Sequence, residues 1–161
     1  MLTRLKKEYK QLQKNPPGNI STYLVDNNYS HWRAIIFGPE GTLYEGGIFK
    51  LDITFTNDYP FKAPKVKFLT KVYHPNVSQY QGDICLDILK KNWSAVLSVR
   101  TALLSICSLL SDPNVDDPLN TAAARLYKEN KLEYDIKVRN FVQEFATLDN
   151  NDDGKENLNK E

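Results

Sequence analysis

Residues 48–55 restrict the possible folds more than any other segment, because their apolar and polar side chains alternate. Phe49, Leu51, Ile53 and Phe55 are apolar, whereas the side chains between them are polar. A period of two is typical of an antiparallel strand that packs one face on a core and leaves the other in solvent. The chain therefore needs a sheet, and other elements must cover one face of it.

Three other strands and four helices are predicted around this strand. Strand-like runs cover residues 20–25, 32–37 and 65–69. Apolar residues at three- and four-residue spacing predict helices over residues 2–12, 99–110 and 134–145, and another that begins near Thr121. This order predicts an α+β fold: an N-terminal helix, a four-stranded antiparallel meander, a long loop and three C-terminal helices, with helices on one face of the sheet.

No sustained period is visible between residues 72 and 97, a stretch too long for a simple connection. Its aromatic and aliphatic side chains, among them Tyr73, Ile84 and Trp93, favour packing over disorder. A long ordered loop inside a compact domain is usually functional. We therefore expect a site between His74 and Leu89, where the sequence reads HPNVSQYQGDICLDIL.

Length and composition bound the class of protein. With 161 residues, 41% of them hydrophobic and 25% charged, the chain is predicted to form one soluble globular domain. We expect this domain to span residues 1–147. Residues 148–161 are acidic and almost free of apolar side chains, which predicts a mobile tail.

Several kinds of partner and site are not expected. The apolar runs are too short to cross a bilayer, and the N-terminus lacks the apolar core of a secretory signal. A net charge of +1 gives no reason to expect nucleic-acid binding. Two cysteines and two histidines without ligand spacing predict neither a metal nor a cofactor. So few cysteines also favour a reducing compartment, the cytoplasm or the nucleus.

Cys85 is the candidate nucleophile. Cys107 lies on the apolar stripe of a predicted helix, as a structural cysteine does, whereas Cys85 lies in the aperiodic loop. Asn76 could supply an amide donor, and acyl transfer needs both an attacking sulfur and a donor for the oxyanion that forms. Structural roles remain open as well: Asn76 and His74 suit a turn, and Asp117 suits the entry to a helix.

Three further segments agree with a site at Cys85. They are YPFKAPKVKF at 59–68, the lone Trp93 and SDPNVDDPLN at 111–120. Together these motifs resemble the ubiquitin-conjugating enzymes, the carrier proteins that hold ubiquitin as a thioester, and the resemblance runs from about Leu2 to about Phe145. It implies the fold of that family. It also implies that Cys85 accepts ubiquitin from the activating enzyme and passes it to a lysine of a substrate or growing chain.

The resemblance implies roles for other residues. Asn76 supports the oxyanion or the loop that forms the site, and Asp117 helps to accept the incoming lysine. His74, chiefly structural, belongs to the active-site groove with Asp87 and Leu119. Matching ligase-binding positions are Arg4, Lys7, Phe61, Ser94 and Ala95, and matching donor-ubiquitin contacts are Leu104 and Ser108. The implied partners are ubiquitin, its activating enzyme, a RING-type ligase and protein substrates, and the carrier is expected to be a monomer.

Two departures from the family pattern affect this site. Many members read Trp-Ser-Pro-Ala where this chain has Trp-Ser-Ala-Val at 93–96, so a rigid proline is missing from the ligase-facing loop. The spacing between Asn76 and Cys85 is one residue longer than in many members. This extra residue could shift the asparagine relative to the cysteine.

Other functions stay open from the sequence alone. One is conjugation of a different ubiquitin-like modifier, and another is a non-catalytic binding module of the same fold. The combination of Cys85, Asn76 and Asp117 disfavours the binding module. A cysteine hydrolase would need His74 or His31 as its base, and neither is followed by a base-orienting acid in a recognisable arrangement.

Overall fold

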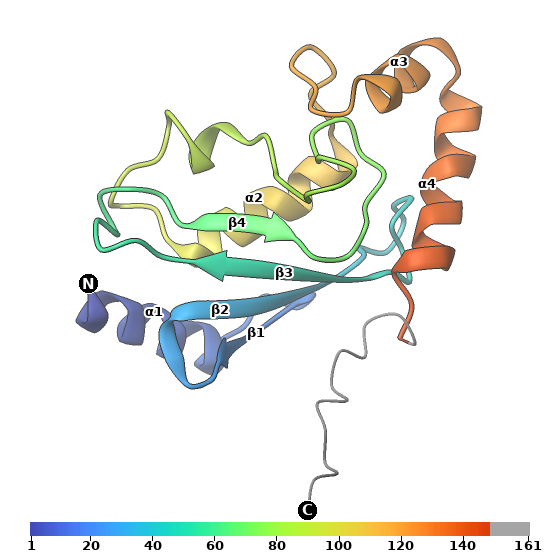
Figure 1. Cartoon of the computed structure of the whole chain (residues 1–161). Coiled ribbons are helices and arrows are strands. Elements are labelled where there is room, and N and C mark those ends of the chain that lie inside the picture. The colour runs from blue at the N-terminus through green and yellow to red at the C-terminus, as the bar shows by residue number, and fades with distance from the viewer. Residues whose placement is uncertain (149–161) are drawn as a thin grey trace, which may run out of the picture.

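The structure of the protein is a computed structural model that describes residues 1–148 (Figure 1). The strands are β1 (Ile20–Val25), β2 (Asn28–Phe37), β3 (Ile48–Thr54) and β4 (Lys65–Phe68). The helices are α1 (Leu2–Lys14), the short 3-10 helix η1 (Asp87–Leu89), α2 (Val99–Ser111), α3 (Thr121–Glu129) and α4 (Lys131–Phe145). Apart from Leu148, the predicted tail lies outside the described residues.

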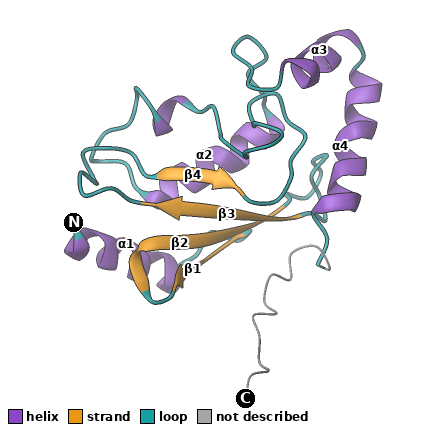
Figure 2. Ribbon diagram, in the orientation of Figure 1, coloured by secondary structure: helices purple, strands orange, loops and turns teal. Residues whose placement is uncertain are grey.

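The sheet is the predicted antiparallel meander. Its strand order is β1-β2-β3-β4, and each strand pairs antiparallel with the next (Figure 2). The predicted start of the second strand at Trp32 is wrong, because β2 begins at Asn28. Asp26 and Asn27 have φ angles of 51° and 56°, as in the two-residue turns that join hairpin strands. The polar run that follows still belongs to the strand, because Asn28 pairs with Val25 of β1 and His31 pairs with Thr54 of β3.

One face of the sheet forms the core. Ala34, Ile36, Leu51 and Ile53 are buried there, together with Leu5 of α1. Val99, Leu103, Ile106 and Leu110 of α2 belong to the same cluster. Helices α1 and α2 therefore cover this face, as the predicted α+β fold requires.

Helices α3 and α4 do not extend that layer but stand at one end of the sheet (Figure 1). Tyr73 packs on α4, with ring centroids 5.9 Å from Tyr134 and 5.3 Å from Phe141. The Ile48 N–H donates to the carbonyl of Ala146 (3.0 Å), which ties the end of α4 to the start of β3. These contacts anchor the long loop at its beginning. Within residues 1–148, no helix has the length and apolar character needed to cross a bilayer.

The long loop is fixed against the edge of the sheet. The Phe68 N–H donates to the carbonyl of Gly82 (2.8 Å), and isolated bridges pair Lys67 with Asp83 and Val77 with Ile84. Gly82 has a φ of +75°, and a Cβ atom there would lie 1.9 Å from the Phe68 carbonyl oxygen. Only glycine fits this close approach. The loop therefore reaches Cys85 in a defined register with β4.

Candidate active site

Cys85 lies at the surface end of this loop and is half-buried. Its N–H donates to the carbonyl of Asn76 (2.9 Å), so a backbone hydrogen bond holds the two residues together. Its sulfur lies 3.8 Å from Oδ2 of Asp117 and 3.9 Å from Nζ of Lys90. A partly exposed thiol between a carboxylate and an ammonium is placed to react with a second molecule.

The second cysteine is in a different environment. Cys107 lies inside α2, where it accepts a hydrogen bond from Nδ2 of Asn19 (3.7 Å). Burial raises the pKa of the Cys107 thiol, which lowers the fraction of reactive thiolate at neutral pH. The sequence-based choice of Cys85 over Cys107 therefore agrees with their surroundings.

Asn76 is buried, with 1% of its surface exposed, and its side chain forms hydrogen bonds with the turn from Asn114 to Asp117. Its Nδ2 donates to the carbonyls of Asn114 (2.8 Å) and Asp117 (3.3 Å), and its Oδ1 accepts from the Asn114 N–H (2.8 Å). Both amide hydrogens are therefore engaged. Of the two roles that the resemblance allowed, this geometry fits support of the loop and leaves no side-chain donor for an oxyanion.

Asp117 is exposed, but its backbone is anchored on both sides. The N–H groups of Leu119 and Asn120 both donate to the carbonyl of Pro75 (2.9 and 3.0 Å). The Asn120 side chain then caps α3 by accepting from the Ala123 N–H (3.0 Å). The turn before α3 is thus bound to the turn before Cys85, which carries the Asp117 carboxylate to the sulfur.

His74 lies beneath the groove rather than in it, with none of its surface exposed. Its Nδ1 accepts from the Asn76 N–H (2.9 Å), and its Nε2 donates to the carbonyl of Leu109 (2.7 Å). Burial lowers the pKa of His74 to about 4, so the ring is neutral at physiological pH. With both nitrogens engaged, it is a structural link and not a general base.

His31 does have an acidic partner, contrary to the sequence-based expectation. Its Nε2 lies 2.7 Å from Oδ1 of Asp52, a carboxylate that also pairs with Arg33 (2.9 Å). The partners are on neighbouring strands, where sequence spacing gives no signal. Within residues 1–148, however, the side chains hydrogen-bonded to the Cys85 sulfur are Asp117 and Lys90. Neither histidine bonds to the thiol, which disfavours a cysteine hydrolase.

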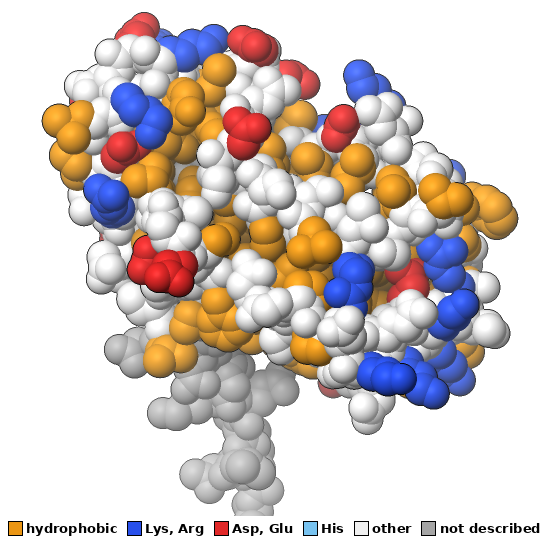
Figure 3. Space-filling view, turned by 180° about the vertical axis from the view of Figure 1, so that it is seen from behind, with side chains coloured by type: hydrophobic (Ala, Val, Ile, Leu, Met, Phe, Trp, Pro, Cys, Tyr) orange, Lys and Arg blue, Asp and Glu red, His pale blue; other side chains and the backbone are white. Residues whose placement is uncertain are grey.

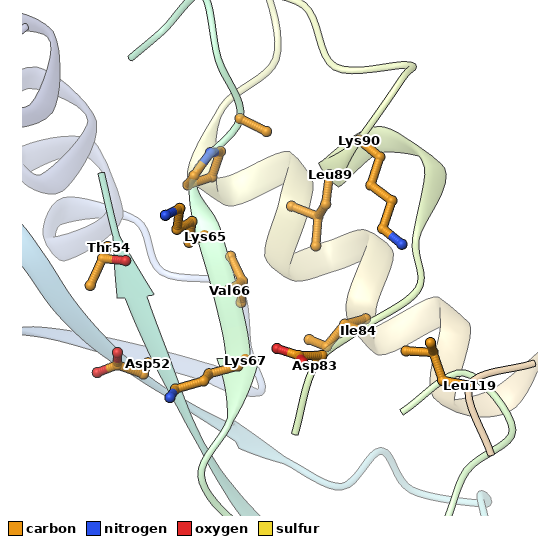
Figure 4. Close-up of a pocket in the computed structure, with 12 residues that line it drawn as sticks. Asp52, Thr54, Lys65, Val66, Lys67, Asp83, Ile84, Leu89, Lys90 and Leu119 are labelled. Carbon is orange, nitrogen blue, oxygen red and sulfur yellow. The ribbon is translucent and has the colours of Figure 1, made fainter. Parts of the chain in front are cut away.

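A cavity of about 570 Å³ is lined by Ile84, the residue before Cys85, and by residues of β3, β4 and the loops around them (Figure 4). Lys65, Val66 and Lys67 of β4 line one side, and Lys90 and Leu119 lie across from them. Leu119, which the resemblance assigned to the active-site groove, is 45% exposed and lines this cavity. The lining combines apolar side chains with three lysines and with the carboxylates of Asp52 and Asp83.

Asp87, Leu104 and Ser108 line a second hollow, of about 450 Å³, between η1 and α2. Asp87 also holds η1 in shape, since its Oδ1 accepts from the Ile88 N–H (2.8 Å) and its Oδ2 from Nδ2 of Asn92 (3.0 Å). Leu104 is 42% exposed in a helix whose opposite face is core. The three residues therefore share one surface next to Cys85.

The residues matched to ligase binding lie where α1 meets two loops. Phe61 is 83% exposed, and the neighbouring loop presents Val96, which the sequence reasoning missed, at 90%. Ser94 and Lys7 are exposed, whereas Ala95 is half-buried. In the view from behind, Lys and Arg side chains gather over α1 (Figure 3).

Arg4 is less free than the resemblance implied. It donates to the carbonyls of Ala95 (3.0 Å) and Leu97 (2.7 Å) and pairs with Glu8 (3.0 Å). It therefore clamps the loop in which the family proline is missing. This long-range contact has no sequence signature, because its acceptors are main-chain carbonyls.

Glu8 is a structural residue that the sequence reasoning missed. It is 6% exposed, and its Oε1 accepts from the N–H of Val99, the first residue of α2 (2.8 Å). Its Oε2 accepts from the Tyr59 hydroxyl, and burial together with this carboxylate raises the pKa of Tyr59. A carboxylate is favoured at a helix N-terminus. The sequence did contain a sign of this burial: Glu8 lies three positions after Leu5 and four before Leu12, and therefore on the apolar stripe of α1.

Comparison with known proteins agrees with this arrangement. The family model for ubiquitin-conjugating enzyme matches residues 4–142. The chain is 52% identical over 141 residues to Ubiquitin-conjugating enzyme E2 3 of Arabidopsis thaliana, covering 88% of this chain and 93% of that protein. The E2 domain of a Toxoplasma gondii ubiquitin conjugating enzyme superposes with a TM-score of 0.85 at 43% identity, covering 91% of this chain and 100% of that one. This chain belongs to the ubiquitin-conjugating enzyme family.

Proposed function

We propose that Cys85 carries ubiquitin as a thioester and passes it to a lysine amine of a protein substrate or a growing chain. Members of this family work with ubiquitin, an activating enzyme and a ligase, and the family is one of transferases. The observation that carries the proposal for this chain is the contact of the half-buried Cys85 sulfur with the Asp117 carboxylate (3.8 Å).

Two acyl transfers make up the reaction. In the first, the Cys85 sulfur attacks the thioester of ubiquitin on the activating enzyme. One C–S bond forms and another breaks, so the exchange is nearly isoenergetic and needs no cofactor on this chain. In the second, a lysine nitrogen attacks the carbonyl carbon, a C–N bond forms, and the electron pair of the broken C–S bond returns to sulfur.

Asp117 is proposed to act in the second transfer. Its carboxylate lies at the sulfur, where an incoming ammonium must be oriented and must lose a proton. Asn76 acts through Asp117, because it holds the turn that carries this carboxylate. Asn76 is therefore a positioning residue in this mechanism.

The proposed partner surfaces follow the exposed groups around the site. The hollow at Asp87, Leu104 and Ser108 would receive the donor ubiquitin. Phe61 and Val96 give a RING-type ligase exposed apolar side chains beside the basic α1. We propose that the protein acts as a monomer in the cytoplasm or nucleus, which size-exclusion chromatography and cell fractionation test.

The direct experiment is loading with activating enzyme, ATP and ubiquitin, read on a gel without reductant. Wild type and Cys107→Ser should each give one adduct that thiol reductant removes. Cys85→Ser should give an oxyester that resists reductant, because oxygen replaces the sulfur. Failure of the wild type to load, or a reductant-sensitive adduct on Cys85→Ser, would overturn the proposal. Parallel reactions with another ubiquitin-like modifier and its own activating enzyme test the alternative cargo.

A further inference from the structure

Glu8 is a buried carboxylate that the proposed acyl transfers do not use. It is 6% exposed and lies on the face of α1 that packs on the core. Its three hydrogen-bond donors come from three segments of the chain: Nε of Arg4 in α1 (3.0 Å), the hydroxyl of Tyr59 in the loop before β4, and the N–H of Val99 at the start of α2 (2.8 Å). The carboxylate therefore links these three segments at one point.

The same segments carry the proposed ligase-binding surface. Tyr59 lies two residues before Phe61, whose side chain is exposed. Arg4 donates to two main-chain carbonyls, one on either side of the exposed Val96. Phe61 and Val96 are thus each connected to Glu8 through one of its donors.

A direct link joins the two loops as well. Nε1 of Trp93 donates to the carbonyl of Pro60 (2.8 Å), and the ring centroids of Trp93 and Tyr59 lie 6.0 Å apart. The Arg4 guanidinium lies over the Tyr59 ring, 5.8 Å from its centroid. The two loops and α1 therefore form one connected unit around Glu8, and the carboxylate at its centre is too buried to touch a partner.

Stability alone is a poor explanation for a charge at this position. Glu8 lies between Leu5 and Leu12 on the buried face of α1, where an apolar side chain would suit the core. Taking a carboxylate out of water costs free energy, and replacing a buried ion pair by apolar side chains is often neutral or stabilising. A buried acceptor does favour one arrangement of its donors, because hydrogen bonds weaken steeply away from their preferred geometry. Glu8 is therefore suited to fixing positions.

We propose that Glu8 is a positioning residue for ligase binding, which holds α1, the turn at residues 59–62 and the loop at residues 94–97 in the arrangement that a RING-type ligase recognises. This inference rests on the proposed ligase surface. A surface that is already ordered loses less conformational freedom on binding, so it binds more tightly. Within residues 1–148, the hydrogen bonds of Glu8 do not reach Cys85 or Asp117. Its loss should therefore weaken ligase binding without slowing the chemistry at the sulfur.

Two variants of the full chain test this role, with a RING domain that binds the wild type as the probe. Glu8→Gln keeps an oxygen for the Val99 N–H but replaces the oxygen that accepts from Arg4 and Tyr59 by an amide donor. The double variant Glu8→Met with Tyr59→Phe replaces both buried polar partners by apolar side chains. Each should bind the RING domain about tenfold more weakly in a titration. Discharge of preformed thioester to free lysine without ligase should keep the wild-type rate.

Stability is measured beside affinity, because a merely structural residue would change both together. The double variant should unfold in urea close to the wild-type midpoint, although its affinity is lower. Asn130→Ala removes the cap of α4 and is the matched control, since it should lower the midpoint and keep full affinity for the RING domain. Hydrogen exchange of the free protein should speed up at residues 59–62 and 94–99 in both Glu8 variants, and not in Asn130→Ala.

Three results would overturn the role of Glu8 while leaving the carrier function standing. They are wild-type affinity of both Glu8 variants, an equal loss of affinity in Asn130→Ala, and unchanged exchange at the two loops. Slower discharge without ligase in the Glu8 variants would also overturn it, because the residue would then act on the whole fold. A wild type that loads ubiquitin yet binds no RING domain would overturn the proposed ligase surface, and this inference with it.

Discussion

The Asp117 carboxylate lies 3.8 Å from the Cys85 sulfur although 32 residues separate them. Asn76 brings them together: its carbonyl accepts the Cys85 N–H, and its side chain donates to the Asp117 carbonyl. The buried asparagine is thus the common support of a nucleophile and a carboxylate from two loops.

Asn76→Ala should load ubiquitin on Cys85 but discharge it to free lysine about a hundredfold more slowly, because Asp117 loses its support. Unfolding in urea should also show a loss of about 1–3 kcal/mol, since buried backbone groups lose their partners. Single-turnover discharge measures the first effect. Asn130→Ala removes the asparagine that caps α4 far from Cys85 and should lower stability without slowing discharge. Equal discharge rates for Asn76→Ala and wild type would remove Asn76 from the mechanism.

Asp117→Ala should slow discharge about a hundredfold near neutral pH. Raising the pH should restore part of the rate, because more of the attacking amine is then already free of its proton. Discharge of the preformed thioester to lysine, followed from pH 7 to pH 9.5, measures this profile. Asp116→Ala is the neighbouring control, since that carboxylate makes an exposed ion pair with Lys128 (3.6 Å). A defect of constant size across this range would show that Asp117 acts only on structure.

His74 should make the fold sensitive to acid. Burial lowers its pKa to about 4 in the folded state, against about 6.5 when unfolded. The unfolded chain therefore binds the proton more readily, and the stability present above pH 6.5 is lost as the pH falls toward 4. This difference amounts to about 2 kcal/mol at pH 5. Urea unfolding of wild type and His74→Gln at pH 7.5 and pH 5 should show a smaller loss for the variant, and equal losses would contradict the assignment.

Variants of Arg4 and Lys7 should distinguish a residue that positions the loop from one that only adds charge to the proposed ligase-binding surface. Arg4→Ala should loosen the loop from Ser94 to Leu97, because two carbonyls lose their donor. Hydrogen exchange at residues 94–97 should speed up, and binding to a RING-type ligase should weaken. Lys7→Ala removes an exposed charge from the same helix and should weaken binding while leaving exchange at the loop unchanged. If Arg4→Ala leaves exchange as in wild type, the clamp does not position the loop.

Much of the fold could be read from the sequence because its elements have clear periods. The alternation in residues 48–55 predicted β3 and the face it buries, and the spacing in residues 99–110 predicted α2. The start of β2 was missed because its first residues are mostly polar and owe their extended shape to strand pairing, since Asn28 pairs with Val25 of β1 and His31 pairs with Thr54 of β3. The small helix η1 was missed as well, since three residues carry no visible period.

Some residues of the candidate site could also be predicted from the sequence, and some of its contacts could not. The loop position of Cys85 marked it as the candidate nucleophile, and the family motifs brought Asn76 and Asp117 into consideration. The contacts of Arg4 and Lys90 could not be predicted, because one depends on distant main-chain carbonyls and the other on a single turn of 3-10 helix. Short-range patterns report burial and periodicity, whereas these contacts depend on how loops fold back.

The close approach of Gly82 to Phe68 fixes the position of the loop three residues before Cys85. The extra length lies before this contact, where Tyr80 is 92% exposed, and the Cys85 N–H still reaches the Asn76 carbonyl at 2.9 Å. Insertions at the tip, between residues 78 and 81, should therefore be tolerated, whereas one between Gly82 and Cys85 would move the sulfur. The tip is thus a suitable place to attach a label or an epitope without moving Cys85.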